Sequence, residues 1–166
     1  DSTWSFFEDG GTPTFKQTWD MGQRWNGSFF NYWPNGQVSE YGNYLNGQWD
    51  GIYMSYYPNG ELEVSTLYKN NEIDGDFIEY FETGSKKLSG EYDNGVKNGI
   101  WTYYDENGTN LFREKYNNGN LEEIDQNLIE RYEDGTLKSV TPLKNGEIHG
   151  TLNRYWPDGS IKEETN

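Results

Sequence analysis

A spacing of 24 residues runs through this chain and constrains its fold more than any other feature. Three columns of residues keep it: Tyr44, Tyr68, Tyr92 and Tyr116; Gly36, Gly60, Gly84 and Gly108; and Gly27, Gly51, Gly75 and Gly99. Independent columns with one period indicate a structural unit that is copied about seven times along the chain. In such arrays each copy packs on its neighbours, and binding is carried by an extended surface rather than by a pocket.

Each copy has the composition of a β-hairpin. In the copy from Gly51 to Gly75, residues 52–57 are rich in Tyr and Ile, and residues 61–68 form a second strand-like segment. Asn59-Gly60 separates the two, and Asn-Gly favours a tight turn because both residues accept positive φ at low cost. Asn70-Asn71 turns the chain again before Gly75 starts the next copy. The pattern predicts an all-β fold, an elongated single-sheet solenoid of about seven tandem antiparallel β-hairpins.

The repeats predict a single domain over residues 1–166. Degenerate copies at 1–26 and 150–166 are expected to cap the open ends of the array. One internal copy is irregular, since Gly135 follows Gly108 by 27 residues rather than by 24. Segment 121–127 holds the insertion, and we expect it to form a loop before the next strand begins.

Composition indicates a thin fold and restricts the partners. Hydrophobic residues make up 32% of the chain and aromatic residues 17%, so rings must provide most of the buried surface. The net charge of −15 opposes binding to nucleic acids and to anionic lipids. It permits a basic protein partner, and it also fits the solubility of a long exposed surface. No segment approaches the roughly 20 apolar residues of a transmembrane span. The chain begins at Asp1 rather than at methionine, which suggests processing; no signal peptide is visible, and cytoplasmic and secreted or cell-surface locations stay open.

Residues that could perform catalysis or hold a metal are scarce. The chain has no cysteine, and its one histidine, His149, occupies a slot that holds Asp50, Asp74 and Asn98 in other copies. A turn role explains His149 better than a catalytic one, and nucleophile–base triads are nearly excluded. Asp74 and its neighbours flank the glycine of the presumed turn and are expected to face solvent. We therefore expect no enzymatic activity, no cofactor and no metal site.

Two kinds of segment carry a resemblance to a known family. Residues 51–60 and 99–108 pair a Tyr-rich strand with an Asn-Gly turn, and residues 92–99 and 143–150 close their copies with Asn-Gly and a final glycine. These segments resemble the MORN repeat, in particular its bacterial variant form, over roughly residues 27–161. The resemblance implies an array of β-hairpins that acts as a protein-binding or membrane-linked scaffold without an active site. It further implies an antitoxin-like or immunity-like role toward a toxin.

Alternation of side chains along each strand suggests where a partner would bind. Tyr53 and Tyr57 share one face of their strand, whereas Met54 and Tyr56 share the other, so both faces carry rings. We expect the Tyr44 column and the column that includes Tyr56 to pack between adjacent copies. An aromatic and acidic sheet surface is the predicted site for a protein partner, and ten residues compose it: Phe29, Trp33, Tyr53, Tyr57, Phe77, Glu79, Phe81, Trp101, Tyr103 and Asp105.

Two other hypotheses remain open from the residues alone. The protein could be an extracellular adhesin or a cell-wall or glycan-binding module that stacks tryptophans on sugar rings or choline groups. The candidates for that stacking are Trp25, Trp33, Trp49, Trp101 and Trp156. Alternatively, unpaired strands at the ends of the sheet could join copies of the chain into homo-oligomers.

Overall fold

The computed structural model describes residues 2–7, 13–20, 23–24 and 26–165, with side chains from residue 26 onward. All regular elements in this part of the chain are β-strands. Their bounds are β1 Ser2–Phe7, β2 Pro13–Asp20, β3 Gln23–Arg24, β4 Gly27–Tyr32, β5 Val38–Leu45, β6 Gln48–Tyr56, β7 Leu62–Lys69, β8 Glu72–Tyr80, β9 Lys86–Asp93, β10 Val96–Tyr104, β11 Asn110–Asn117, β12 Asn120–Arg131, β13 Leu137–Lys144, β14 Glu147–Ile148, β15 Leu152–Tyr155 and β16 Ile161–Thr165.

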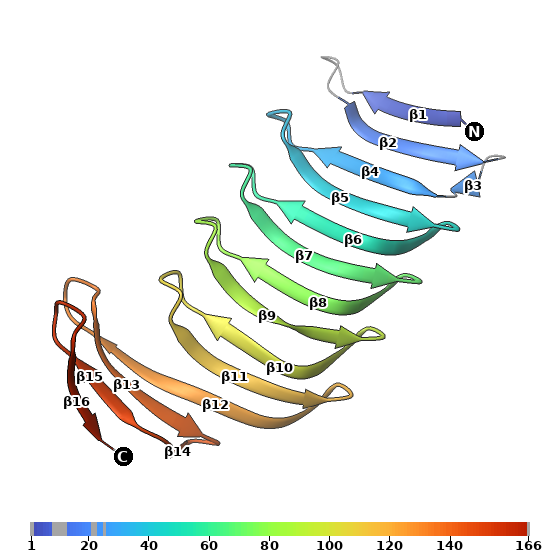
Figure 1. Ribbon diagram of the computed structural model, residues 1–166. Coiled ribbons are helices and arrows are strands. Elements are labelled where there is room, and N and C mark those ends of the chain that lie inside the picture. Colours follow the sequence, from blue (N-terminus) through green and yellow to red (C-terminus); the bar gives the residue numbers. More distant parts are fainter. Residues whose placement is uncertain (1, 8–12, 21–22, 25, 166) are drawn as a thin grey trace.

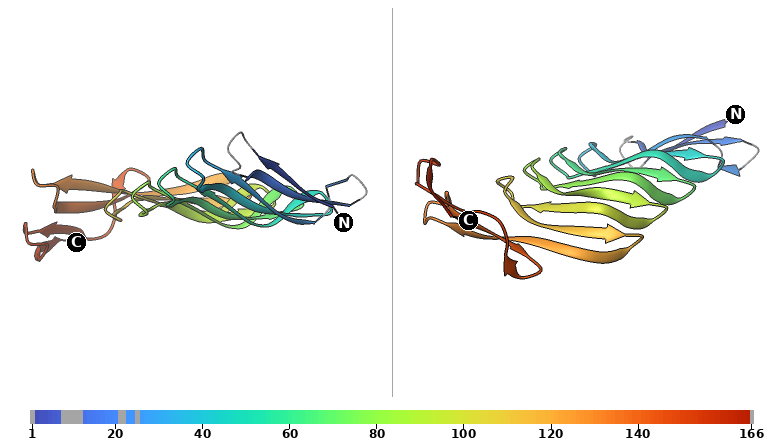
Figure 2. Two further views of the ribbon diagram at one scale, coloured as in Figure 1. Left: turned by 90° about the horizontal axis from the view of Figure 1, so that it is seen from above. Right: turned by 60° about the horizontal axis from the view of Figure 1, so that its bottom comes forward.

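The strands form one long antiparallel array in chain order. Strands β4 to β16 make a 13-stranded sheet in which sequence neighbours pair from β4 to β13. Both β14 and β15 pair with β13, and β16 pairs with β15. Strands β1, β2 and β3 pair among themselves, and β2 lies beside β4 (Figure 1). Figure 2 shows an elongated and thin molecule in which no second layer covers the sheet from β4 to β11. The prediction of an all-β, single-sheet solenoid of hairpins is confirmed.

The hairpins use two kinds of turn. At one edge of the sheet, Asn46-Gly47 and Asn94-Gly95 have positive φ at both residues, as two-residue type I′ turns require. At the other edge only the glycine has positive φ, as in Gly60 with a φ of 91°. There the Gly60 N–H donates to the Tyr57 carbonyl and the Tyr57 N–H donates to the Glu61 carbonyl, both at 2.9 Å, which is a longer loop with a bulge at the glycine.

Asn59 therefore has a different role from the one that we expected. Its φ is not positive, so that explanation of the Asn59-Gly60 turn is wrong. Its side-chain oxygen accepts a hydrogen bond from the Glu61 N–H at 2.8 Å, and its side-chain nitrogen donates to the Glu82 carbonyl of the next copy at 2.9 Å. Asn35 makes the matching bond to the Pro58 carbonyl at 2.8 Å. Asparagine thus stabilises its own turn and links it to the following one.

The glycines that we expected to start each copy lie inside strands. Gly51, Gly75 and Gly99 have positive φ values of 104°, 121° and 68°, within β6, β8 and β10. Between the pairs Gly42–Tyr53 and Tyr44–Trp49, β6 contains three residues where β5 contains only Asn43. Each glycine thus occupies a bulge, where a positive φ lets one strand carry extra residues. The prediction of a turn at Gly75 is wrong, because β8 continues through it.

The insertion also lengthens a strand instead of forming a loop. β12 runs without a break from Asn120 to Arg131, so the expected loop over 121–127 is wrong. The position that the period would give to a glycine holds Glu123, whose φ is not positive. β11 pairs with β12 along residues 120–126, whereas β13 pairs with it along residues 125–131. The array therefore steps sideways at β12, and the last hairpins lie displaced from the others (Figure 1).

Candidate functional site

Strand register divides the side chains of the sheet between two faces. One face, here called the aromatic face, carries most of the rings: Phe29, Tyr44, Trp49, Tyr53, Tyr68, Phe77, Tyr92, Trp101, Tyr103 and Phe112. The other, here called the opposite face, carries Tyr41, Ile52, Met54, Leu67, Asp76, Ile78, Glu91 and Ile100. All fully buried residues of the described part lie on the aromatic face: Phe29, Gly42, Ser55, Thr66, Trp101 and Ser139. This face is therefore the core of the single-layer protein.

Two clusters of rings build that core. Around Trp49, the ring centroids of Phe29, Tyr44 and Tyr68 lie at 4.9, 4.8 and 5.4 Å. Trp49 thereby bridges two members of the Tyr44 column, so that column does take part in packing between copies. Such tilted and edge-to-face contacts are favourable for aromatic rings and let neighbouring copies shield one another without a second layer.

The second cluster surrounds Trp101, which is 1% exposed. Its ring centroid lies 4.9 Å from that of Tyr92 and 5.7 Å from that of Phe77. Lys97 covers the ring, with Nζ 4.3 Å from the centroid, a cation–π distance. Gly90 on the neighbouring strand leaves the space that the indole fills, since a Cβ there would lie 2.3 Å from Trp101 Cδ2.

The aromatic residues predicted to bind a partner are engaged within this core. Phe29 is 3% exposed and Trp101 1%, so these two offer almost no surface to another molecule. The Tyr53 hydroxyl donates to Glu40 at 3.2 Å, and burial, followed by the Glu40 charge, raises the pKa of Tyr53 well above its ordinary value. Phe77 packs on Trp101 as described above. Ring count predicted these residues, but it does not distinguish rings that pack inside the fold from rings that meet a partner.

Tyr103 is engaged in a similar way further along the same face. Its ring stacks on that of Phe112, with centroids 4.2 Å apart, and its hydroxyl donates to Glu114 at 2.7 Å. Burial raises the pKa of Tyr103 well above its ordinary value, and the hydrogen bond to Glu114 adds to the effect. The phenol therefore stays protonated and keeps donating.

Three more predicted residues, Trp33, Tyr57 and Phe81, begin the longer turns. Trp33 Nε1 donates to the Tyr56 carbonyl at 2.9 Å, and the Tyr57 hydroxyl donates to the Tyr80 carbonyl at 2.8 Å. Each bond spans 23 residues and so connects one copy to the next. Phe81 has no such polar group, and the Nζ of Lys87 lies 6.0 Å from its ring centroid. These residues hold the array together along one edge.

The two predicted acidic residues are paired within the protein. Glu79 forms an ion pair with Lys87. Asp105 forms one with Arg131, and its Oδ1 also accepts the N–H groups of Asn107 at 3.0 Å and Thr109 at 2.9 Å. Burial acts to raise the pKa of Asp105, but the Thr109 N–H and the Arg131 guanidinium outweigh it, so the pKa lies below its ordinary value.

A test of this pair is the replacement Asp105→Asn. A carboxylate with a lowered pKa stabilises the folded state above its unfolded pKa of about 4, and this stabilisation is lost as the pH falls through the folded value. We expect the variant to be about 1 kcal/mol less stable than the wild type at neutral pH, with the difference shrinking below pH of about 4. Urea unfolding measured across this pH range checks it, with Glu106→Gln as a control on an exposed turn residue. If the free energies of unfolding of wild type and variant change with pH in parallel, the ion pair does not contribute to the pH dependence of stability.

The opposite face differs in having exposed apolar side chains and unpaired acids. Ile52, Leu67 and Ile100 are 43%, 39% and 59% exposed. A hollow of about 340 Å³ lies beside them, lined by Asp76, Ile78, Ser89, Gly90, Glu91 and Ile100. We did not identify this surface from the sequence. The signal was the alternation along each strand, where Ile52, Leu67 and Ile100 directly precede the ring residues of the other face.

Neither a metal-binding cluster nor a membrane-spanning helix is found in the described part of the chain. Among the described residues, no group of three or more His, Asp or Glu side chains is placed to hold a metal ion. The same part of the chain contains no helix with the length and apolar character that a membrane crossing needs. His149 lines a pocket of about 350 Å³ on the opposite face together with Arg113, Asp125 and Lys144.

These features define an open, single-layer repeat array whose candidate sites are surfaces of a sheet. Comparison with protein families agrees, because a family model described as MORN repeat variant matches residues 25–46, 49–70 and 97–109. The first two matches contain one hairpin each, β4–β5 and β6–β7, and the third contains most of β10 and its following turn. Together they cover less than half of the chain. The chain is thus similar to the MORN repeat variant at three places. Comparison with curated proteins finds no match.

Proposed function

We propose that the protein is a non-catalytic repeat scaffold that binds another protein through a face of its sheet. The observation that carries this proposal is the uncovered opposite face, with exposed apolar side chains at Ile52, Leu67 and Ile100. Large apolar side chains exposed beside polar residues are typical of protein-binding surfaces. The repeats recognised by the MORN-variant model support a scaffold role as well.

Charge supports a basic partner. The chain carries a net charge of −15, which would steer a basic protein toward it and repel acidic ones. Carboxylates on the aromatic face are largely used internally: Glu40 accepts from Asn31 at 2.6 Å and Glu63 from Ser55 at 2.9 Å. The acids left for a partner are therefore those on the opposite face and on the turns. Within this proposal, the specific role is that of an antitoxin or immunity protein that neutralises a basic toxin.

Glycan stacking has less support from the same geometry. Trp49 and Trp101 pack among other rings, and Trp33 donates its N–H to the next copy. Trp156 is 49% exposed, but Lys162 Nζ lies 4.3 Å from its ring centroid and occupies one side of it. The Trp25 side chain falls outside the described residues.

Affinity capture tests the proposed function. The chain is immobilised and exposed to an extract of its source cells, and bound material is eluted with increasing salt and identified by mass spectrometry and sugar analysis. We expect a basic protein that elutes at raised salt and binds again, after purification, in a one-to-one titration. Retention of polysaccharide alone would contradict the proposal. Co-expression then tests the antitoxin role, since the captured protein should inhibit growth alone and not with the scaffold.

A further inference from the structure

Two acidic residues lie side by side on the opposite face, and no cation among the described residues neutralises their charge. Asp76 on β8 pairs directly with Glu91 on β9, and both side chains are exposed. Neither carboxylate has an ion pair within the described part of the chain, although Glu79 on the same strand β8 has Lys87. Like charges directly opposite each other on neighbouring strands destabilise a sheet. The fold therefore gains nothing from this acid pair, here defined as Asp76 and Glu91.

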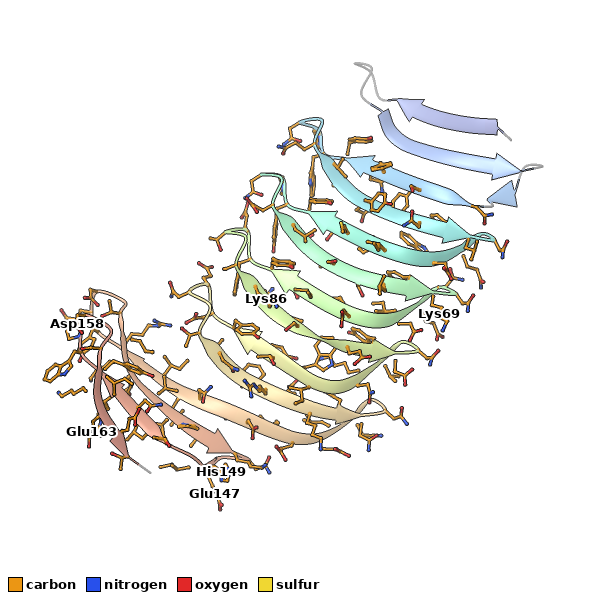
Figure 3. All side chains as sticks on the ribbon, in the orientation of Figure 1. Lys69, Lys86, Glu147, His149, Asp158 and Glu163 are labelled. Atoms are coloured by element: carbon orange, nitrogen blue, oxygen red, sulfur yellow. The ribbon has the colours of Figure 1, made fainter. Side chains whose placement is uncertain are left out.

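Nearby lysines do not neutralise the acid pair. Lys69 and Lys86 lie toward the two ends of their strands, at opposite edges of the sheet (Figure 3). Lys69 is already paired with Asp74, at 3.3 Å from Nζ to Oδ2. The charge of the acid pair is thus available to another molecule.

Apolar side chains flank the acid pair on both sides. Ile52 pairs with Leu67 across β6 and β7, which lies next to β8. Ile100 on β10, next to β9, is 59% exposed and shares the hollow of about 340 Å³ with both acids. Across strands β6 to β10, the opposite face therefore presents apolar side chains on β6 and β7, acidic ones on β8 and β9, and an apolar one on β10. No second layer covers it (Figure 2).

We propose that this surface binds an extended basic segment of the protein partner, one with Lys or Arg and apolar residues alternating on one side. Its cations would lie over Asp76 and Glu91, and its apolar side chains over Leu67 and Ile100. The inference rests on the proposed function and adds the face and the chemistry of the segment. Charge disfavours a second copy of this chain, at −15, and an anionic lipid surface. Arg113 on β11 marks the end of the surface, because it would repel further cations.

The test uses a synthetic peptide of repeating Lys-Ser-Leu-Ser, which places Lys and Leu alternately on one side of an extended chain. Its affinity is measured by fluorescence anisotropy for the wild type, for Asp76→Asn with Glu91→Gln, and for Glu106→Gln with Glu133→Gln. The two double variants change the net charge equally, but the second removes exposed turn acids away from the surface. We expect the first to weaken binding roughly tenfold and the second to weaken it less than about twofold.

Two further controls test whether weakened binding reflects unfolding and whether the apolar side chains contribute to it. Removing the like-charge pair should leave the protein as stable as before or more so, so weakened binding would not reflect unfolding. Ile100→Ser should weaken binding several-fold, whereas Leu128→Ser, at a site that is 57% exposed on the aromatic face, should not. Equal affinity of the two double variants for the peptide overturns the inference, as does an unchanged affinity of Ile100→Ser.

The captured partner separates this inference from the proposed function. If the same protein binds the wild type and the Asp76→Asn, Glu91→Gln variant equally well, the inference is wrong and the scaffold function stands. If only polysaccharide is captured, the scaffold function is wrong, whatever the peptide shows. Loss of the captured protein in this variant, with retention in the Glu106→Gln, Glu133→Gln variant, supports both.

Discussion

Replacing Trp101 with alanine is expected to lower the free energy of unfolding by about 3–5 kcal/mol, the range for loss of a large buried ring. Trp101 is 1% exposed and contacts Phe77, Tyr92 and Lys97, so its removal opens a cavity that a single-layer sheet has few means to fill. In a repeat array each copy is stabilised by its neighbours, so the damage should be concentrated near the lost contact.

Urea unfolding and hydrogen exchange measure this effect. We expect the amides of β9, β10 and β11 to lose protection first, while those of β5 and β6 change less. Trp156→Ala is the matched control, because Trp156 is 49% exposed and its loss should change stability by less than about 0.5 kcal/mol. Similar losses in the two variants would contradict the assignment of Trp101 as the centre of the core.

Replacing Gly90 with alanine is expected to destabilise the protein by about 1–3 kcal/mol, although it adds one methyl group. The added Cβ would lie 2.3 Å from Cδ2 and 2.4 Å from Cε2 of Trp101, closer than real Cβ contacts. The indole is rigid and held between rings, so it has little freedom to move away. Gly90 does not have a positive φ, so the cost comes from contact and not from the backbone.

A second substitution in the same contact separates these causes. Trp101→Phe shortens the ring and removes an indole N–H that has no acceptor among the described residues. In the Trp101→Phe background, Gly90→Ala should therefore cost less than in the wild type, and unfolding of the four proteins in a double-mutant cycle measures the difference. Ser89→Ala, whose side chain points to the other face, serves as the neutral control. An equal cost in both backgrounds would rule out the steric contact as the cause.

Much of the fold could be predicted from the turn residues and from the period of the repeat. Asn-Gly at Asn46-Gly47 has few conformations other than a tight turn, and a period of 24 residues leaves room for two strands and two turns. The bulges were harder to predict, because a glycine such as Gly75 is equally compatible with a turn and with an irregular strand. The continuation of β12 was missed for a related reason, since pairing with β11 along residues 120–126 and with β13 along residues 125–131 outweighed a polar local composition.

The assignment of rings to the packed face was harder to predict, because the sequence places rings on both sides of each strand. Trp101 and Tyr56 are both aromatic residues of a strand, yet Trp101 lies in the core and Tyr56 does not. The difference depends on cross-strand partners such as Gly90, which admits a large ring on one face only. Which residues become cross-strand partners depends on pairing between neighbouring copies, so the sequence of a single copy does not reveal it. The acid pair needed the same knowledge of register.

The sideways step at β12 has a mechanical consequence. Its two neighbours overlap on this strand only at Asp125 and Gln126, so along most of its length β12 is bonded to a neighbour on one side alone. Twisting or pulling the molecule should concentrate strain at this joint. The segment from β13 onward would then unfold as a separate cooperative unit, while the longer part of the sheet from β4 to β11 stays folded.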